Sequence, residues 1–137
     1  MLIYKENFEY SKSEILALYT SVGWSNYTRE PDMLHRAFAN SLYVLAAFDG
    51  NKLVGVVRAV GDGASIVFAQ DLLVLPQYQR RGVGSELLRR LMQKYQDVYQ
   101  FQLLTDNSAK NIAFYESVGL IKCSDVNCCA FMRVQQA

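Results

Sequence analysis

The chain has 137 residues, the length of one domain, and its 51% hydrophobic and 20% charged residues are typical of a globular protein. This composition excludes a disordered chain, a collagen and a coiled coil, and no apolar run approaches the 18 residues of a membrane-spanning helix. With 14 basic and 13 acidic residues the net charge is +1, which does not support a broad nucleic-acid interface. We therefore expect one domain, residues 1–137, with neither a nucleic acid nor a membrane as its partner.

The three cysteines do not indicate a disulfide framework or a metal site. Cys123, Cys128 and Cys129 are odd in number and lack the spacing of zinc ligands. We expect reduced thiols, buried as small hydrophobic side chains, in a cytoplasmic protein whose N-terminus has no signal-like apolar stretch. The single histidine, His35, is expected on a helix surface rather than as a ligand or a partner of a catalytic cysteine.

The first third of the chain predicts two helices. Ser11 and Glu14 have the spacing of a capping box, so a helix should begin there and end near Gly23. A second helix is expected over about residues 31–39, because Pro31 suits a first turn and apolar residues recur at helical spacing after it. Residues 23–27 form the loop between the two helices.

The middle of the chain predicts three strands in a row. Residues 42–48, 53–60 and 65–75 are apolar and strand-like, and tight turns rich in glycine separate them. Strands joined in this way form an antiparallel meander.

After Pro76 the hydrophobic pattern becomes helical again. A helix that contains Val83 and Leu91 precedes a short strand at residues 101–105, which should lie parallel to the strand at 65–75. A helix is expected over residues 109–118 and a last strand over 128–134. The predicted fold class is α/β or α+β, with a mixed sheet and flanking helices.

The junction between the third strand and the following helix carries the clearest functional pattern. Gly82 and Gly84 remove side chains where the backbone approaches something closely, and the first helical turn has N–H groups without intrahelical partners. The helix dipole and two adjacent arginines, Arg80 and Arg81, add positive charge. The pattern favours an anion site suited to phosphate; the alternative is a glycine turn with solvated arginines. The spacing matches neither a Walker P-loop nor a dinucleotide-binding fingerprint.

The segment from Gln79 to Gly84, Gln-Arg-Arg-Gly-Val-Gly, resembles the Q/R-x-x-G-x-G/A motif of the GNAT (Gcn5-related) N-acetyltransferases. Residues 72–76 look like the strand that precedes this motif, and residues 113–120 look like the later A-x-Y-x-x-x-G-F element. The resemblance implies a GNAT-like fold, with antiparallel N-terminal strands and two parallel central strands that splay apart. It also implies an N-acetyltransferase that uses acetyl-CoA as cosubstrate and needs no metal.

The resemblance implies roles for residues at both ends of the cosubstrate. Tyr115 matches the tyrosine that protonates the leaving thiolate; the alternative for Tyr115 is a core aromatic. The residues expected to bind the cosubstrate lie on the third strand, in the glycine motif and on the later helix: Leu73, Val74, Gln79, Arg80, Arg81, Gly82, Val83, Gly84, Ser85 and Asn111.

The attacking amine needs a base, and Asp71 is the candidate because a carboxylate in an apolar strand is costly unless it is used or paired. The alternative is that Asp71 pairs with Arg58 on the neighbouring strand. Trp24 and Tyr27 are the candidate acceptor-binding residues, through aromatic or cation–π contact; the alternative for Trp24 is a loop anchor packed on the core.

The predicted function is acetyl transfer to a primary amine, most simply that of a small molecule. A protein N-terminus or lysine is the alternative acceptor. A non-catalytic module that binds or senses acyl-CoA is a second class of function, and a nucleotide-binding protein that uses the same phosphate site is a third. Many relatives in the resembled family pair their last strand with a second copy, so a homodimer is also an expectation.

Overall fold

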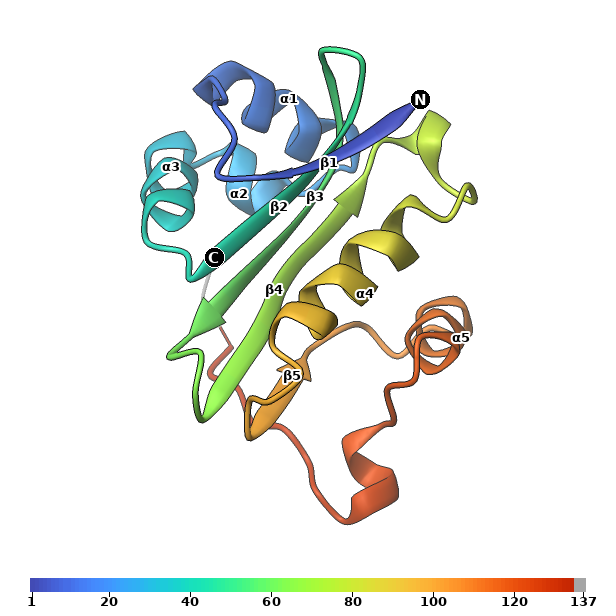
Figure 1. The fold of residues 1–137 in the computed structure, drawn as a ribbon. Coiled ribbons are helices and arrows are strands. Elements are labelled where there is room, and N and C mark those ends of the chain that lie inside the picture. Colours follow the sequence, from blue (N-terminus) through green and yellow to red (C-terminus); the bar gives the residue numbers. More distant parts are fainter. Residues whose placement is uncertain (135–137) are drawn as a thin grey trace. The chain divides into compact units, whose positions relative to one another are not determined.

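The computed structural model describes residues 1–134, and its contacts divide the chain into two compact units, of which the second begins at Thr105 (Figure 1). The first unit contains β1 (Leu2–Glu6), α1 (Lys12–Ser21), α2 (Ser25–Thr28), α3 (Pro31–Ala39), β2 (Tyr43–Asp49), β3 (Lys52–Gly61), β4 (Ile66–Val74), the 3-10 turn η1 (Pro76–Tyr78), α4 (Val83–Lys94) and β5 (Gln100–Leu103). The second contains α5 (Ala109–Ser117) and the 3-10 turn η2 (Cys123–Val126).

The first unit is built on a five-stranded sheet in the order β1-β2-β3-β4-β5. β1 to β4 pair in antiparallel fashion, and β4 pairs with β5 in parallel, as the connection through α4 requires. The mixed sheet and the antiparallel meander are therefore confirmed. β1 was not predicted, because five residues with only two half-buried side chains give a weak alternating pattern.

Helices cover both faces of this sheet (Figure 1). A Cβ placed on Gly55 of β3 would lie 3.2 Å from Leu87 and 3.3 Å from Val83, so this position faces α4 and needs a residue without a side chain. Arg58, three residues further on, points to the opposite face and reaches Ala37 of α3. The core thus has two layers, and the charged pair described below lies in the layer under α1–α3.

Local signals place the boundaries of several elements where the sequence predicts them. The Ser11 hydroxyl accepts a hydrogen bond from the Glu14 amide at 3.1 Å and so caps α1. The β2–β3 hairpin pairs Asp49 with Lys52 around Gly50, which has φ of +62° as such a tight turn requires. Ser108 caps α5 by accepting from the Asn111 amide at 3.3 Å. α2 is the helix that the pattern missed, since one helical turn leaves no periodicity.

Two predictions for the C-terminal part are wrong. Residues 128–134 form no strand, because their backbone pairs with no other strand among the described residues and an unpaired segment has no ladder to stabilise it. Cys123, Cys128 and Cys129 are free thiols, as predicted, but they are exposed rather than buried, since they lie in and after η2 outside any apolar layer. No helix within residues 1–134 is long and apolar enough to cross a membrane.

Candidate active site

The glycine loop, residues 79–85, joins the end of β4 to α4 and presents unpaired backbone amides. Gly82 is the N-cap of α4 and has φ of +79°, and Arg80 also adopts a left-handed conformation with φ of +63°. Within residues 1–134, no protein group accepts a hydrogen bond from the amides of residues 80–85; the first amide of the helix with an acceptor is that of Glu86, which donates to the Gly82 carbonyl. Several N–H donors at a positive helix end form a site for an anion such as a diphosphate.

β4 continues beyond its partner strand on the side of β5. β5 pairs with Ile66–Ala69, the first part of β4, and residues 70–74 have no neighbouring strand on that side within the described sheet. The change coincides with a β-bulge: Arg58 pairs with Asp71 and Ala59 with Ala69, which leaves Gln70 as the extra residue. A bulge bends its strand and increases its twist, so β4 diverges from β5 at this point.

The open edge of β4 offers Val74 but not Leu73 to a ligand. The Leu73 carbonyl lies 3.3 Å from the Cβ position of Gly55 and therefore faces β3. The Val74 carbonyl faces the other way and accepts a hydrogen bond from the Gln79 side chain at 3.0 Å. Backbone groups alternate between the two edges of a strand, so of the two residues predicted to bind the cosubstrate through the backbone, Val74 lies on the open edge.

Tyr78 of η1 fixes the glycine loop to the β2–β3 hairpin. Its hydroxyl donates to the Asp49 carboxylate at 2.5 Å, and the Arg81 guanidinium lies over its ring at 5.2 Å from the centroid. The Asp49 contact is the main reason that the pKa of Tyr78 is raised. This anchor was missed because nothing in the sequence links residue 78 to the hairpin.

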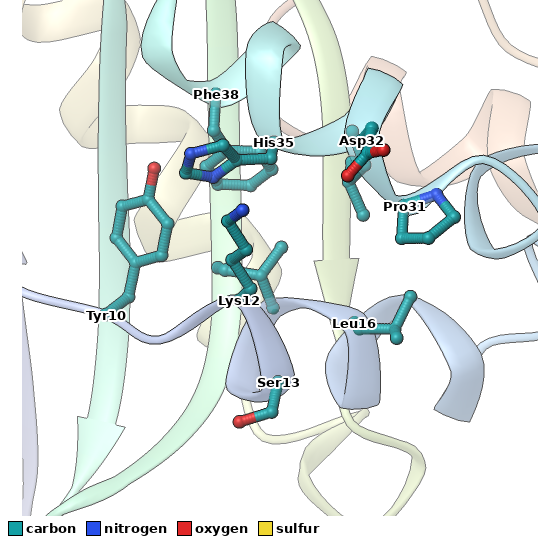
Figure 2. Close-up of a pocket in the computed structure, with 10 residues that line it drawn as sticks. Tyr10, Lys12, Ser13, Leu16, Pro31, Asp32, His35 and Phe38 are labelled. Carbon is teal, nitrogen blue, oxygen red and sulfur yellow. The ribbon is translucent and has the colours of Figure 1, made fainter.

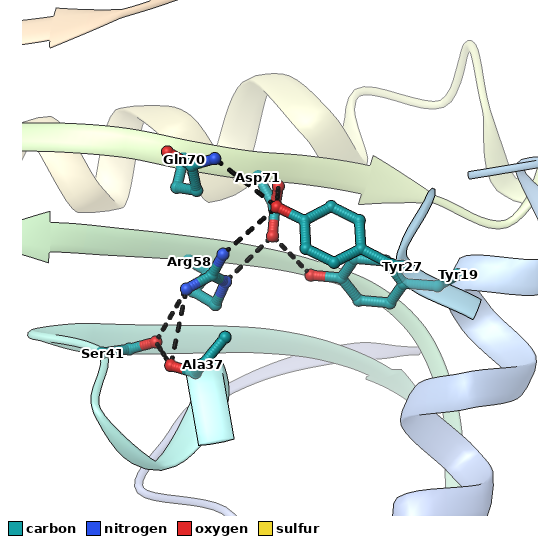
Figure 3. Close-up of polar contacts among 7 residues, drawn as sticks. All are labelled: Tyr19, Tyr27, Ala37, Ser41, Arg58, Gln70 and Asp71. Carbon is teal, nitrogen blue, oxygen red and sulfur yellow. Dashed lines mark hydrogen bonds and ion pairs between the residues drawn. The ribbon is translucent and has the colours of Figure 1, made fainter. Parts of the chain in front are cut away.

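Asp71 lies at the centre of a polar group that we call the Asp71 cluster (Tyr19, Tyr27, Arg58, Gln70 and Asp71; Figure 3). The side chain of Asp71 accepts from the Tyr19 hydroxyl at 2.8 Å, from the Tyr27 hydroxyl at 3.0 Å and from Arg58 Nε at 2.9 Å. Asp71 is 3% exposed and Arg58 is 4% exposed. The pairing with Arg58 is the alternative that the sequence left open, and it makes direct contact between Asp71 and an acceptor impossible in this conformation.

Burial and the charge of Asp71 act in opposite directions on the pKa of Arg58 and in the same direction on the pKa of the two tyrosines. Burial favours a neutral Arg58, but the Asp71 carboxylate outweighs it and raises the Arg58 pKa. Burial, followed by the charge of Asp71, raises the pKa of Tyr19. Burial also raises the pKa of Tyr27, so both phenols stay protonated and donate to the carboxylate.

Trp24 and Tyr27, the candidate acceptor-binding residues, belong to one aromatic group around Tyr19. Trp24 stacks on Tyr27 with ring centroids 6.2 Å apart, and its edge meets Tyr19 at 5.8 Å. Trp24 is half-buried, which agrees with its interpretation as a loop anchor. The hydroxyl oxygen of Tyr27 lies 3.4 Å from Nε2 of Gln70 at the bulge.

Tyr115 and Asn111, the other predicted site residues, lie on α5 in the second unit. Tyr115 is half-buried and packs edge-on against Phe114 at 5.0 Å. Burial and the nearby Asp106 carboxylate raise the pKa of Tyr115, which keeps the phenol protonated. The Asn111 side chain donates to Asp106 at 3.0 Å, so it helps to fix the start of the helix.

The basic face of α4 is partly neutralised by carboxylates. Arg89 and Arg90 both pair with Glu86, at 2.7 and 3.0 Å, and Lys94 lies 3.8 Å from Glu6. The charged residues that follow the glycine loop therefore form a solvent-exposed helix face on which ion pairs link them.

A separate pocket of about 240 Å³ lies between α1 and α3 (Figure 2). Its floor is apolar, and Lys12, Asp32 and His35 stand at its rim. None of the predicted site residues lines it, and His35 is exposed on α3 as expected. Within residues 1–134, no cluster of three or more histidine, cysteine or carboxylate side chains could hold a metal ion.

Both the sequence and the fold of this chain are similar to those of known proteins. The sequence model described as "Acetyltransferase (GNAT) family" matches residues 8–120. A GNAT-family acetyltransferase from Streptococcus pneumoniae TIGR4 has a similar structure, with a TM-score of 0.89 and 39% identity over 100% of both chains. An uncharacterized N-acetyltransferase described as ycf52-like, from Prochlorococcus marinus, is 30% identical over 86% of this chain and 67% of its own length. AAC(6')-Iy, solved with the bisubstrate analogue CoA-S-monomethyl-acetylneamine, shares the fold, with a TM-score of 0.69 and 13% identity over 99% of both chains.

Proposed function

Because the chain belongs to the GNAT family of acetyltransferases, we propose that it transfers the acetyl group of acetyl-CoA to the primary amine of a small molecule. The observation that carries the proposal is the set of amides at residues 80–85 without a protein acceptor, next to an edge of β4 that has no neighbouring strand within residues 1–134. In this proposal the whole of residues 1–137 acts as one N-acetyltransferase domain, and the free thiols suit a reducing compartment such as the cytoplasm.

The glycine loop would hold the diphosphate of the cosubstrate. Its amides donate to the phosphate oxygens, and Gly82, which the positive φ at this position favours, adds no side-chain atoms beside them. Arg80 and Arg81 supply positive charge, and the Tyr78 ring restricts the Arg81 side chain. The N–H of Val74 on the open edge of β4 would bond the pantetheine arm, since the Val74 carbonyl already accepts a hydrogen bond from the Gln79 side chain.

The chemistry proposed is direct attack of the amine on the thioester carbonyl. A bond forms between nitrogen and the carbonyl carbon, the bond from carbon to sulfur breaks, and the nitrogen loses one proton. Tyr115 gives a proton to the departing thiolate and regains one from solvent; its raised pKa keeps that proton in place at neutral pH. N–H groups on the open edge of β4 would stabilise the charge that develops on the carbonyl oxygen.

The acceptor is proposed to be an amine recognised by aromatic side chains. The aromatic group of Trp24 and Tyr27 favours an amine that stacks or makes a cation–π contact. AAC(6')-Iy was solved with an analogue that contains acetylneamine, so neamine is a reasonable member of a test panel. A protein N-terminus or a lysine side chain is the alternative acceptor.

The test is release of free thiol from acetyl-CoA in the presence of neamine, spermidine, phenethylamine, free lysine and a short peptide with a free N-terminus. We expect turnover with at least one amine, and at least a tenfold lower kcat for Tyr115→Phe, which retains the ring and lacks the proton. Tight CoA binding without turnover of any amine would instead support a module that senses acyl-CoA. Tighter binding of ATP than of CoA would support the nucleotide-binding alternative.

A further inference from the structure

The buried carboxylate of Asp71 has one partner that is also open to solvent. Tyr19 is 0% exposed and Arg58 is 4% exposed, and both bond to Asp71 Oδ2. The other oxygen, Oδ1, accepts from the Tyr27 hydroxyl at 3.0 Å, and Tyr27 is half-buried. Among the side chains that contact the carboxylate, Tyr27 therefore provides the connection to the surface.

The Tyr27 hydroxyl lies at the point where β4 leaves β5. Its oxygen is 3.4 Å from Nε2 of Gln70, the extra residue of the bulge, and the paired part of β4 ends at Ala69 (Figure 3). Because the hydroxyl proton points to Asp71, the lone pairs of the oxygen face Gln70 and Arg58 Nη2, both at the long distance of 3.4 Å. A shorter and stronger hydrogen bond from an incoming amine can replace these contacts.

On the basis of the proposed function, we propose that Tyr27 is a catalytic residue that relays the proton of the attacking amine to Asp71. Its oxygen accepts a proton from the amine nitrogen while its own proton passes to Asp71 Oδ1. The acceptor enters as an ammonium ion: it gives one proton through Tyr27 to Asp71 before it attacks, and Tyr27 ends neutral. The proton that its nitrogen loses after the attack goes to solvent, from which Tyr115 regains the proton that it gave to the thiolate. After the amide product leaves, the proton returns to solvent along the same path, so one turnover leaves the enzyme unchanged.

The contacts of the cluster give each residue a distinct part. Arg58 and Tyr19 hold Oδ2, so Oδ1 remains as the atom that can take a proton, and the carboxyl stays oriented toward Tyr27 in both states. The two tyrosines thus make the same kind of bond to one carboxylate, but only Tyr27 can touch an acceptor. This difference provides a matched pair of variants, Tyr27→Phe and Tyr19→Phe.

The experiment measures kcat and the KM for acetyl-CoA with the amine of the panel that the wild type acetylates fastest. Tyr27→Phe keeps the ring against Trp24, so we expect an unchanged KM for acetyl-CoA. The kcat should be about 100-fold lower, which is the scale of general base catalysis. Tyr19→Phe should lower thermal stability and reduce kcat by less than about fivefold, because its phenol donates to Asp71 without reaching the acceptor.

Two further readouts separate a relay from a structural role. Adding Asp71→Asn to Tyr27→Phe should lower kcat by less than the product of the two single effects, because both changes interrupt one path. The deficit of Tyr27→Phe should shrink as the pH rises toward the pKa of the free amine, since the amine then arrives without its extra proton.

The outcomes are distinct. A wild type that acetylates none of the amines contradicts the proposed function and this inference with it. An active wild type in which Tyr27→Phe and Tyr19→Phe lose the same kcat, with no dependence on pH, overturns the relay alone and leaves acetyl transfer in place.

Discussion

The Asp71 cluster lies on β4 and the glycine loop follows that strand, and their polar groups differ in whether they have partners within the protein. In the loop, the amides of residues 80–85 have no acceptor among the protein groups of residues 1–134. In the cluster, the Asp71 carboxylate accepts hydrogen bonds from three protein side chains, and residues 1–134 contain no buried side-chain nitrogen or oxygen without a hydrogen-bond partner.

The difference separates polar groups that hold the fold from polar groups available to a ligand. A buried charge without a partner costs several kcal/mol, so a charge inside the protein has to be paired there. Amides at an exposed helix start cost little when water solvates them, and the protein can leave them free for an anion. Substitutions in the cluster should therefore act first on stability, and those in the loop on binding.

The largest expected effect is the loss of Arg58. Arg58→Met leaves the Asp71 carboxylate buried without its cation, which should lower the free energy of unfolding by about 3–5 kcal/mol. The double variant Arg58→Met with Asp71→Leu removes both charges and should recover a large part of this loss. Urea unfolding of the variants measures it, and a double variant less stable than Arg58→Met would contradict the pairing argument.

A branched side chain in the loop should affect binding instead. Gly84→Val places two methyl groups beside the free amides, so we expect about 100-fold weaker CoA binding, close to 2.7 kcal/mol. The same variant should unfold at nearly the wild-type urea concentration, because its site is half-exposed. Calorimetry with CoA gives the affinity, and an unchanged dissociation constant would rule out the loop as the phosphate site.

Gly82 and Gly23 form a matched pair that sharpens the comparison. Their φ angles are +79° and +76°, and a Cβ would meet no atom within 4 Å at either position. Replacement by alanine should therefore cost the same conformational strain, about 1–2 kcal/mol, in both. Only Gly82→Ala should also weaken CoA binding, by about tenfold or 1.4 kcal/mol. Equal affinities of the two variants for CoA would argue against a ligand at the loop.

The smallest expected effect concerns the pH dependence of Tyr115. Asp106 contributes to the raised pKa of this phenol, so Asp106→Asn should lower that pKa. If Tyr115 is the acid, the alkaline limb of the kcat profile then moves to lower pH, since the phenol loses its proton earlier. If the alkaline limb of the kcat profile does not move, then either Asp106 does not affect the pKa of the acid or Tyr115 is not the acid.

Much of the fold was predictable because its signals are local. The capping residues Ser11 and Ser108 and the hairpin at Gly50 mark ends of elements, and the change of hydrophobic period at Pro76 marks the passage from strand to helix. The strand predicted for residues 128–134 failed because an apolar run fixes no partner. A strand depends on pairing with a neighbour, which the sequence of the strand alone does not show.

The site was predictable to a different degree in its two parts. The glycine loop could be predicted because the motif, the helix start and the free amides all occupy one continuous segment. In the Asp71 cluster only the pairing of Asp71 with Arg58 was foreseen, as one of two alternatives. The bonds from Tyr19 and Tyr27 could not be predicted, because these residues are 52 and 44 positions from Asp71 and have no unusual local context. For Tyr19 in particular, the helical spacing of apolar residues predicts only a core position. The packing of α1 on the sheet is what brings its hydroxyl to Asp71.

The bulge at Gln70 makes the number of residues in β4 as important as their identity. Since Arg58 already pairs with Asp71 and Ala59 with Ala69, a chain without residue 70 could pair these strands in unbroken register. β4 would then be straighter, and β5 could follow it further toward Val74 and close the edge that now stands open. We therefore expect deletion of Gln70, which alters no charge and no core side chain but removes the contact with Tyr27, to reduce access to this edge of the sheet. In a redesign of this chain, an insertion or a deletion within β4 therefore matters more than a substitution there.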